Sequence, residues 1–410
     1  MRLAVFTSKY PARVATFFER DMRALLEAGI DIEIFPIYPL EPSLWHYSLD
    51  ILSEYVLPRS KVHHISLGKS LRTARPWKPG NLSTFLRDTA AVSFSAAKFG
   101  TAALAKSVYV YPKACAWAQQ YPHEYDHILA YWGNYAATAA YIFHRLMKRQ
   151  VPFSMWLHAG TDLYRNGVYL RQKLLYSDNI VTCCEFNRKF LQDEYSDIFQ
   201  QISAKILVCY HGLDFAEFPY EPKGRPERKV IAVGKFDKNK GFDYLLKAAH
   251  ELSFRGINIE VELVGDGEQA GSLRELVNEL RMADRVKFRG WLPFTAVQAA
   301  MRGATILVHP SDGIGDGLPN VIRESMALGT PVIASRVAGI PEALDNGRCG
   351  LLVPPKDVKA LADGIQTLLK SEALRFEYAN LARRYAEAKF DLWQNGKCLA
   401  DRLQTTQRPN

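Results

Sequence analysis

Short apolar strands alternate with amphipathic helical stretches along most of the chain, and this alternation limits the possible folds more than any other feature. It begins with an apolar strand at residues 3–6, a helical repeat that ends at Gly29, and a second strand at residues 30–34. Strands separated by helices usually pair in parallel. The pattern therefore predicts an α/β protein built on parallel sheets.

The alternation runs in two series, and a polar, proline-bearing stretch separates them. Further strands are expected at residues 128–132, 153–157, 180–183, 206–208, 230–233, 259–264, 286–288, 305–309, 332–334 and 351–353. A chain of 410 residues is too long for one ordinary core and suits two domains of about 200 residues. We expect two doubly wound, Rossmann-like domains at 1–215 and 230–385, a linker at 216–229, and a C-terminal helix at 386–410 that returns to the N-terminal domain.

Ligands of doubly wound sheets bind outside the carboxyl ends of the strands, so the site is expected in a central cleft that the two domains face. No apolar run reaches the ~18 residues that cross a bilayer. The chain opens directly on a strand-like run without a signal peptide, and none of its six cysteines forms a CxxC pair. Reduced thiols in a cytoplasmic protein are the expectation.

Positive charge is concentrated between Arg59 and Lys113. This segment holds ten lysines and arginines against one acid, Asp88, and the excess equals the net charge of +9 of the whole chain. Such a patch suits an anionic membrane surface or a diphosphate-bearing, lipid-linked acceptor. A solvated face without a partner is the alternative, and nucleic acid is not expected.

A glycine-rich loop is expected between the strand that ends at His309 and a helix that starts near Leu318 or Pro319 and ends at Gly329. Its glycines are Gly313, Gly315 and Gly317. Free amides and the positive end of the helix dipole meet at such a turn. The segment is therefore expected to bind phosphate.

Two carboxylates flank the start of this helix, Asp316 in the loop and Glu324 eight residues later. On a helical wheel Glu324 lies at the edge of the apolar arc, whereas Arg323 points away from it. Carboxylates accept hydrogen bonds well from sugar hydroxyls, so the pair is expected to hold two parts of one ligand.

The segment DGLPNVIRE at 316–324 resembles the E-x7-E signature of retaining glycosyltransferase family 4, which has the GT-B fold. The resemblance implies that Asp316, in place of the usual Glu, contacts the transferred sugar and that Glu324 holds the nucleotide ribose. Gly317 and Leu318 are then donor-binding as well. The chain is thus expected to be a hexosyltransferase-type glycosyltransferase.

A second stretch, VGKFDKNKG at 233–241, resembles the family element V-G-R-x-x-x-x-K-G, with Lys in place of Arg at 235. The resemblance implies that Gly234, Lys235 and Lys240 bind the donor, and that the two lysines stabilise the leaving diphosphate. Gly265, in the loop LVGDG, is expected near the nucleotide.

In the N-terminal half, the stretch HAGTDLY at 158–164 looks like an element of the exopolysaccharide-assembly branch of the family. The resemblance places His158 beside the donor sugar and Asp162 on the acceptor side. Arg13 lies in a loop that resembles an acceptor loop of the same branch, and it is expected to meet an acceptor phosphate.

No DxD-type acidic cluster stands beside a strand, so we expect a metal-independent enzyme that needs no cofactor beyond its nucleotide-sugar substrate. The family resemblance implies retention of the anomeric configuration and a place in exopolysaccharide biosynthesis. Two alternatives stay open: a nucleotide-sugar epimerase or sugar-phosphate transferase of the same architecture, and a binding module without catalysis. A dinucleotide oxidoreductase is disfavoured because no GxGxxG follows the first strand.

Overall fold

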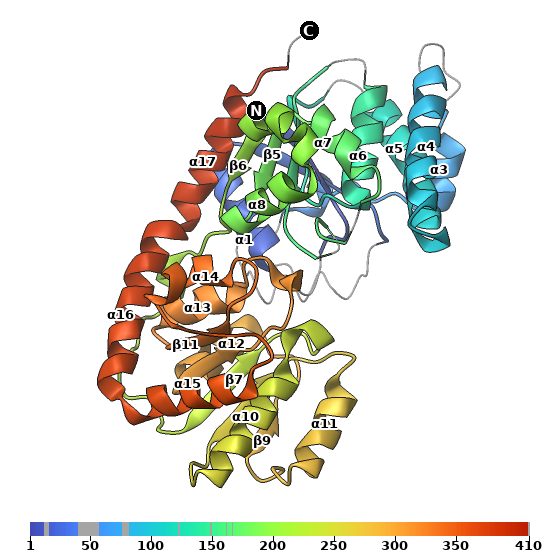
Figure 1. Ribbon diagram of the computed structural model, residues 1–410. Coiled ribbons are helices and arrows are strands. Elements are labelled where there is room, and N and C mark those ends of the chain that lie inside the picture. Colours follow the sequence, from blue (N-terminus) through green and yellow to red (C-terminus); the bar gives the residue numbers. More distant parts are fainter. Residues whose placement is uncertain are drawn as a thin grey trace. The chain divides into compact units, whose positions relative to one another are not determined.

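The computed structural model describes residues 1–11, 16–39, 57–75, 82–121, 124–147, 150–160, 162–165 and 167–408. The chain forms two compact units, each described by itself below (Figure 1). Unit 1 comprises Met1–His211 together with Leu392–Asn410, and unit 2 comprises Gly212–Asp391. Each unit contains a six-stranded sheet in which all pairings are parallel.

In unit 1 the strand order is β2-β1-β3-β4-β5-β6. The chain therefore reverses direction across the sheet between β1 and β3, which is where a doubly wound sheet opens its ligand crevice. The strands and helices of the unit are β1 (Arg2–Thr7), α1 (Thr16–Glu27), β2 (Asp31–Pro36), α3 (Leu67–Thr73), α4 (Leu82–Ala97), α5 (Thr101–Gln120), β3 (His127–Ala130), α6 (Tyr135–Leu146), β4 (Phe153–Leu157), α7 (Leu170–Tyr176), β5 (Asn179–Thr182), α8 (Glu185–Glu194), α9 (Ser196–Ile202), β6 (Ile206–Val208) and α17 (Leu392–Thr405).

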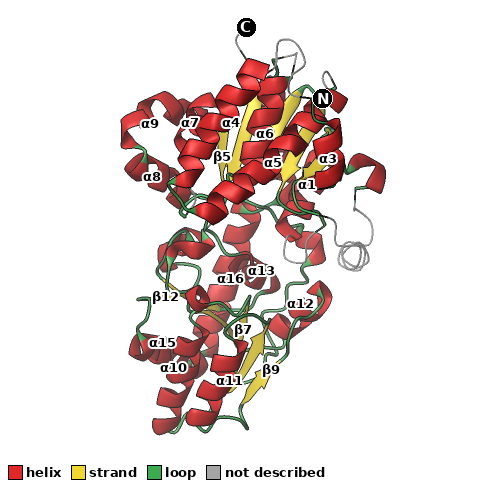
Figure 2. Cartoon of the chain, turned by 90° about the vertical axis from the view of Figure 1, so that its right-hand side faces the viewer, coloured by secondary structure: helices red, strands yellow, loops and turns green. Residues whose placement is uncertain are grey.

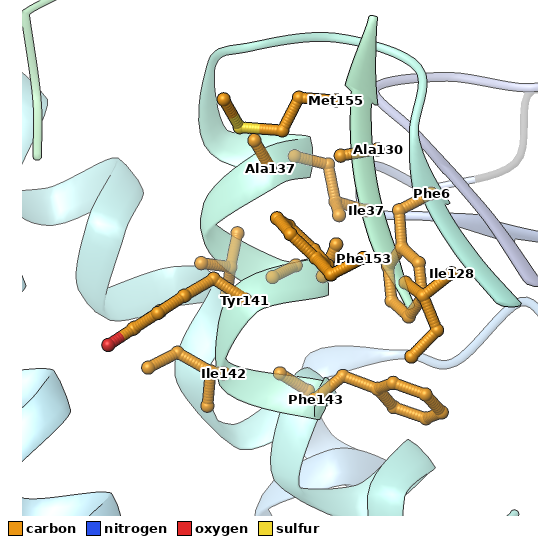
Figure 3. Close-up of a cluster of buried hydrophobic side chains, with 14 of the residues drawn as sticks. Phe6, Ile37, Ile128, Ala130, Ala137, Tyr141, Ile142, Phe143, Phe153 and Met155 are labelled. Atoms are coloured by element: carbon orange, nitrogen blue, oxygen red, sulfur yellow. The ribbon is translucent and has the colours of Figure 1, made fainter. Parts of the chain in front are cut away.

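One face of this sheet carries the larger core. Phe6, Ile128 and Phe153 point from neighbouring strands toward α6, and the ring of Phe143 lies 5.0 Å from that of Phe6 (Figure 3). All three strand side chains are fully buried. Since strand side chains alternate between faces, these residues place α6 on one side and leave Leu3 and Val5 for the other.

The opposite face of the unit 1 sheet is covered by α1 and by the C-terminal helix α17. The two helices approach closely at Gly396, where an added Cβ would lie 2.3 Å from the Cβ of Ala24. Leu399 and Leu403 of α17 are buried in the same cluster as Leu3 and Val5. The helix expected to return to the N-terminal domain thus packs there from Leu392 on, after α16 has ended in unit 2.

In unit 2 the strand order is β12-β11-β10-β7-β8-β9, so the direction of winding reverses between β10 and β7. Figure 2 draws the strands in yellow and labels β7, β9 and β12 of this unit. Its strands and helices are β7 (Lys229–Val233), α10 (Phe242–Phe254), β8 (Glu260–Val264), α11 (Ala270–Glu279), β9 (Val286–Phe288), α12 (Phe294–Arg302), β10 (Ile306–His309), α13 (Asn320–Leu328), β11 (Val332–Ser335), α14 (Ile340–Ala343), β12 (Leu351–Val353), α15 (Val358–Lys370) and α16 (Glu372–Lys389). Aliphatic residues of β7, β8 and β10 form its core with α10 and α15.

The stretch 216–229, expected to be a linker, belongs to unit 2 and packs against it. The guanidinium group of Arg225 explains the difference, because it bonds to carbonyl groups at the ends of two helices. Its partners are the main-chain oxygens of Glu221, Met301, Arg302, Ala304 and Leu328, at 2.7–3.1 Å. The proline-rich, polar composition of the stretch did not distinguish a free linker from a segment held by one half-buried arginine.

The basic segment forms α3, α4 and α5, together with residues outside the described ranges. Lys113 is one of the ten cations of this segment, but it does not contribute to a surface patch. It is buried in α5, where its ammonium group donates to the carbonyl oxygen of Ile37 at 2.7 Å. Burial lowers the pKa of Lys113 to about 8. None of the helices in the described ranges is both long and apolar enough to span a bilayer.

Gly396→Ala tests the contact between α17 and α1. In a helix, alanine is ordinarily favoured over glycine by about 1 kcal/mol. Here the added methyl group meets Ala24, so we expect a net destabilisation of about 1–3 kcal/mol. The matched control is Gly271→Ala in α11, where nothing lies within 4 Å of the added Cβ and stability should stay equal or rise slightly. Urea unfolding curves measure both changes, and equal curves for the two variants would contradict the packing described.

Candidate active site

Three loops of unit 2 meet at the carboxyl edge where the strand order reverses. They follow β7, β8 and β10, which are adjacent in the sheet. The carbonyl oxygen of Asn239 accepts a hydrogen bond from the amide of Asp312 at 3.0 Å and from the hydroxyl of Ser311 at 2.8 Å. The amide of Phe236 donates to the carbonyl oxygen of Asp266 at 2.9 Å. The three loops therefore form one connected rim.

Two glycines permit this close approach. At Gly265, with φ of +132°, an added Cβ would lie 1.9 Å from the carbonyl oxygen of Gly234. At Gly241, with φ of +64°, it would lie 2.1 Å from the carbonyl oxygen of Pro310. Any larger residue at either position would force the loops apart, and the left-handed backbone adds to its cost.

The two predicted lysines lie on the loop that follows β7. Lys235 is exposed and Lys240 is half-buried. The side chain of Lys240 passes beside Gly234, since its Cε lies 3.8 Å from the position of a Cβ on that glycine. Lys240 ends a 3₁₀ turn, Lys238–Lys240, that leads into α10. The structure thus places Gly234, Lys235 and Lys240 together on the rim, and their contact with a donor stays a prediction.

The start of α13 completes the rim. Pro319 caps the helix without a side-chain hydrogen bond, and Gly317 before it has φ of +52°. The Pro319 side chain therefore accepts no hydrogen bond from the first amides of α13. An anion site at a helix N-terminus requires amides that no capping side chain occupies. Leu318 is buried beside this turn. The helix begins at Asn320, slightly later than the sequence indicated.

Asp316 and Glu324 flank this turn. Glu324 is buried, with 7% of its surface exposed. The backbone of Asp316 ends a 3₁₀ turn, Ile314–Asp316, whereas its side chain lies outside what the structure describes. The expected contact of Asp316 with the transferred sugar stays a prediction.

The expectation that Arg323 points away from the core was wrong. Its side chain is fully buried, donates to the side-chain oxygen of Asn320 and lies 5.6 Å from the ring centroid of Phe390. The reason is that α16 packs on α13 and covers the face that an isolated amphipathic helix would expose. Arg383 of α16 donates to the carbonyl oxygen of Ala327 at 2.6 Å.

In unit 1, His158 follows β4 directly and belongs to a buried aromatic cluster at the carboxyl edge of the sheet. Its ring stacks on that of His211, with centroids 5.0 Å apart and planes inclined by 4°. Other rings that contact the two histidines are those of Phe17, Tyr131, Trp132 and Trp156. Nε2 of His158 is buried and makes no hydrogen bond to any residue that the structure describes. Buried polar atoms are rarely left unpaired, so this nitrogen is a candidate contact for a ligand.

Asp21 of α1 holds the second histidine. Its Oδ2 lies 2.6 Å from Nδ1 of His211 and also accepts the hydroxyl hydrogen bond of Tyr131. Burial alone lowers the pKa of His211, but attraction to Asp21 and the hydrogen bond between them outweigh it. The pKa of His211 therefore lies above its ordinary value.

Cys183 completes this buried group of titratable side chains. A hydrogen bond with Cys184, followed by a hydrogen bond with His211 and its charge, holds the pKa of the Cys183 thiol well below the ordinary value. The amide group of Asn187 donates to the carbonyl oxygen of His158 and contacts the Cys183 sulfur at 3.3 Å. These contacts fix the position of the His158 carbonyl group.

Asp162 supports His158 from within the unit. Its Oδ2 accepts a hydrogen bond from the main-chain amide of His158 at 2.6 Å and lies 3.3 Å from ring atom Nδ1. Its side chain is buried, which favours a role in holding His158 over the acceptor contact expected from the sequence. Nearby, Lys173 donates to the carbonyl oxygen of Gly133 at 2.9 Å. Burial lowers the pKa of Lys173 to about 7, although the charge of Asp162 opposes this shift.

Arg13 lies outside the described residues. All six cysteines are unpaired thiols. Within the described ranges, no group of three or more His, Cys, Asp or Glu side chains is placed to hold a metal ion.

Comparison with known proteins covers both units. Residues 227–371 match the family model described as Glycosyl transferases group 1. The chain is similar to the amylovoran biosynthesis glycosyltransferase AmsK of Erwinia amylovora, with 26% identity over 95% of this chain and 96% of the relative. It is also similar to the putative colanic acid biosynthesis glycosyltransferase WcaL of Salmonella typhimurium, with 24% identity over 88% and 89% of the two chains.

Two solved structures share the fold along nearly the whole chain. Sucrose-phosphate synthase from Thermosynechococcus elongatus superposes with a TM-score of 0.73 at 18% identity, covering 98% of both chains. HepE from Anabaena, in complex with UDP, gives a TM-score of 0.69 at 18% identity, covering 98% of this chain and 99% of that one. The predicted GT-B fold and glycosyltransferase assignment are confirmed, whereas family 4 in particular stays a prediction.

Asp21→Asn tests whether His211 is charged in the folded protein. A raised pKa of His211 contributes stability that is present below about pH 6.5 and is lost as the pH rises through the folded value. The other titratable groups that face His211 are Cys183, His158 and Tyr131. We expect the variant to lose about 1–3 kcal/mol of unfolding free energy at pH 5.5 and less at pH 8.5. Urea unfolding at both pH values measures the difference.

The matched control for this experiment is Asp178→Asn. Asp178 also lies in unit 1, but it accepts hydrogen bonds from the amide of Phe153 and from Arg408. Its loss should cost the same amount at pH 5.5 and pH 8.5. A deficit of Asp21→Asn that is equally independent of pH would show that His211 is neutral.

Proposed function

Because this chain is a glycosyltransferase whose residues 227–371 form a Glycosyl transferases group 1 domain, we propose that it transfers a hexose from a nucleoside diphosphate sugar to a saccharide acceptor. The relatives AmsK and WcaL carry names from amylovoran and colanic acid biosynthesis. These names support a place in exopolysaccharide assembly.

The donor is proposed to bind unit 2 at the point where the strand order reverses. The single observation that carries this proposal is the connected rim on which Lys235, Lys240 and the start of α13 lie together. Two ammonium groups and a helix N-terminus at one sheet edge match the charge of a diphosphate. Glu324, behind the rim, is suited to accept hydrogen bonds from ribose hydroxyls. The HepE structures with UDP and with UDP-glucose support a UDP-sugar.

The proposed reaction retains the anomeric configuration and uses no metal ion. The bond between the anomeric carbon and the diphosphate oxygen breaks, and the acceptor oxygen forms the new glycosidic bond on the same face of the sugar. The departing phosphate oxygen takes the proton of the acceptor hydroxyl. Lys235 and Lys240 stabilise the negative charge that develops on this oxygen, as fixed cations in a shielded site do.

The acceptor is proposed to be a lipid-linked saccharide, met at the cytoplasmic face of the membrane. The supporting observation is the excess of positive charge in the segment from Arg59 to Lys113, because lipid-linked acceptors carry phosphates and lie on anionic surfaces. Peripheral membrane contact of the enzyme belongs to the same proposal.

Lys240→Met tests the donor site, with Lys238→Met as its matched control. Both lysines lie on the 3₁₀ turn after β7, but the side chain of Lys240 runs along Gly234, whereas Lys238 is exposed. Removing a cation that stabilises the leaving group should lower kcat/KM by about 100-fold or more. The control should stay within about threefold, since Lys238 is not among the side chains nearest to Gly234, as Lys240 is. Steady-state transfer assays and UDP titrations measure both variants.

The donor for these assays is chosen by a thermal-shift panel of UDP, GDP and ADP sugars. Turnover of the donor without an acceptor would indicate an epimerase, and tight nucleotide binding without turnover on any acceptor would indicate a binding module. Equal losses in Lys240→Met and Lys238→Met would contradict the proposed donor site.

Treatment with EDTA tests the proposed absence of a metal ion. Because the lysines are proposed to neutralise the diphosphate, we expect the transfer rate to change by less than about twofold. The same product, examined by NMR at its anomeric proton, reports the configuration. Loss of activity that Mg²⁺ or Mn²⁺ restores would refute metal independence, and an inverted product would refute retention.

A further inference from the structure

The outer face of α4 is apolar, basic and free of acids. Along this helix the exposed residues recur every three or four positions, so they form one stripe. They are Leu82, Ser83, Leu86, Arg87, Ala90, Phe94 and Ala97, and the exposed Lys98 directly follows the helix. Phe94 is 71% exposed and Leu86 is 56% exposed, which is unusual for side chains of this size.

Helix α3, which like α4 packs on α5, shows the same combination. Leu71 is 61% exposed, between Lys69 and Arg72, which are also exposed. On α5, Val108 is exposed near Lys106. Bulky apolar side chains thus lie close in sequence to exposed cationic side chains on all three helices.

The only acid of the segment is removed from this surface. Asp88 is buried on the inner side of α4, where its Oδ2 accepts a hydrogen bond from Arg145 at 2.8 Å. Its other oxygen lies 3.3 Å from Nε of Arg87. The charged side chains on the described part of this surface are therefore all positive. The same surface exposes large apolar side chains, whose contact with water is unfavourable.

We propose that the outer faces of α3 and α4 dock on an anionic phospholipid bilayer, with Leu71, Leu86 and Phe94 entering the headgroup region. The cations match the charge of the phospholipids, and the leucines and phenylalanine gain by leaving water. Lys98 lies 4.9 Å from the ring centroid of Phe94, so one side chain can reach phosphates while the other enters the bilayer. A nucleic acid would match the positive charge, but it would not give the exposed leucines an apolar environment. This docking does not depend on the proposed transfer reaction.

Flotation with vesicles tests the proposal on the full chain. The probes are vesicles of phosphatidylcholine alone and of phosphatidylcholine with phosphatidylglycerol. The wild-type chain should float with the anionic vesicles only. Leu86→Ser/Phe94→Ser should lower the partition coefficient by about tenfold or more, since large apolar groups drive interfacial binding. Lys69→Gln/Lys98→Gln/Lys106→Gln should lower it by about 100-fold, because each cation near the surface contributes about fivefold.

Matched controls separate this surface from general stickiness. Phe254→Ser removes a side chain that is 75% exposed on α10 of unit 2. Lys359→Gln/Lys370→Gln/Lys397→Gln removes three exposed lysines of α15 and α17. Both controls should float like the wild type, and all variants should keep their melting temperatures and UDP binding.

Two results would overturn the proposal. If no chain floats, or if the control variants lose flotation as much as the α4 variants do, the outer faces of α3 and α4 do not dock on lipid. If the lysine variant loses binding but Leu86→Ser/Phe94→Ser keeps it, the surface binds anions by charge alone and no side chain enters the bilayer. Such a surface would bind a nucleic acid equally well. Intact UDP binding in the non-floating variants distinguishes failed docking from a failed donor site.

Discussion

The rim of unit 2, the proposed donor site, depends on backbone contacts that only glycine permits. The loops after β7, β8 and β10 meet because no side chain separates Gly265 from the carbonyl of Gly234, or Gly241 from that of Pro310. Adjacent parallel strands bring these loops to one edge, but the contacts set how close they come. A Cβ at either glycine would widen the rim. The lysines and the start of α13 would then lie too far apart to share the proposed diphosphate.

Unit 1 achieves rigidity by a different means, through buried charge. Asp21 pairs with His211, and His211 stacks on His158, whose backbone Asp162 holds. Burying a charge is costly unless its partners are fixed, so each group limits the positions open to the next. The exception is Nε2 of His158, which the described residues leave without a hydrogen bond. The network therefore fixes the position of that nitrogen, and its contact with a ligand stays a prediction.

The sequence predicted the strands of both units closely because their signal is local. The stretch 153–157 matches β4 at both ends, and the glycine loop before α13 lies where proline and glycine placed it. The errors arose where distant packing decides. Arg323 was assigned to the outer face because the sequence around it does not indicate that α16 packs on α13. Asp21 was missed because its partner, His211, lies 190 residues away along the chain.

The lysines show why composition alone could not locate the function. Lys113 and Lys173 are buried and donate to main-chain carbonyls, so their charge serves the fold, and burial lowers their pKa values. Lys235 and Lys98 are exposed, one on the rim of unit 2 and the other on the outer face of α4. A cation can recognise an anionic ligand only where the fold has not already used its hydrogen bonds. The same residue type therefore holds a core together at two positions and is available for phosphate at two others.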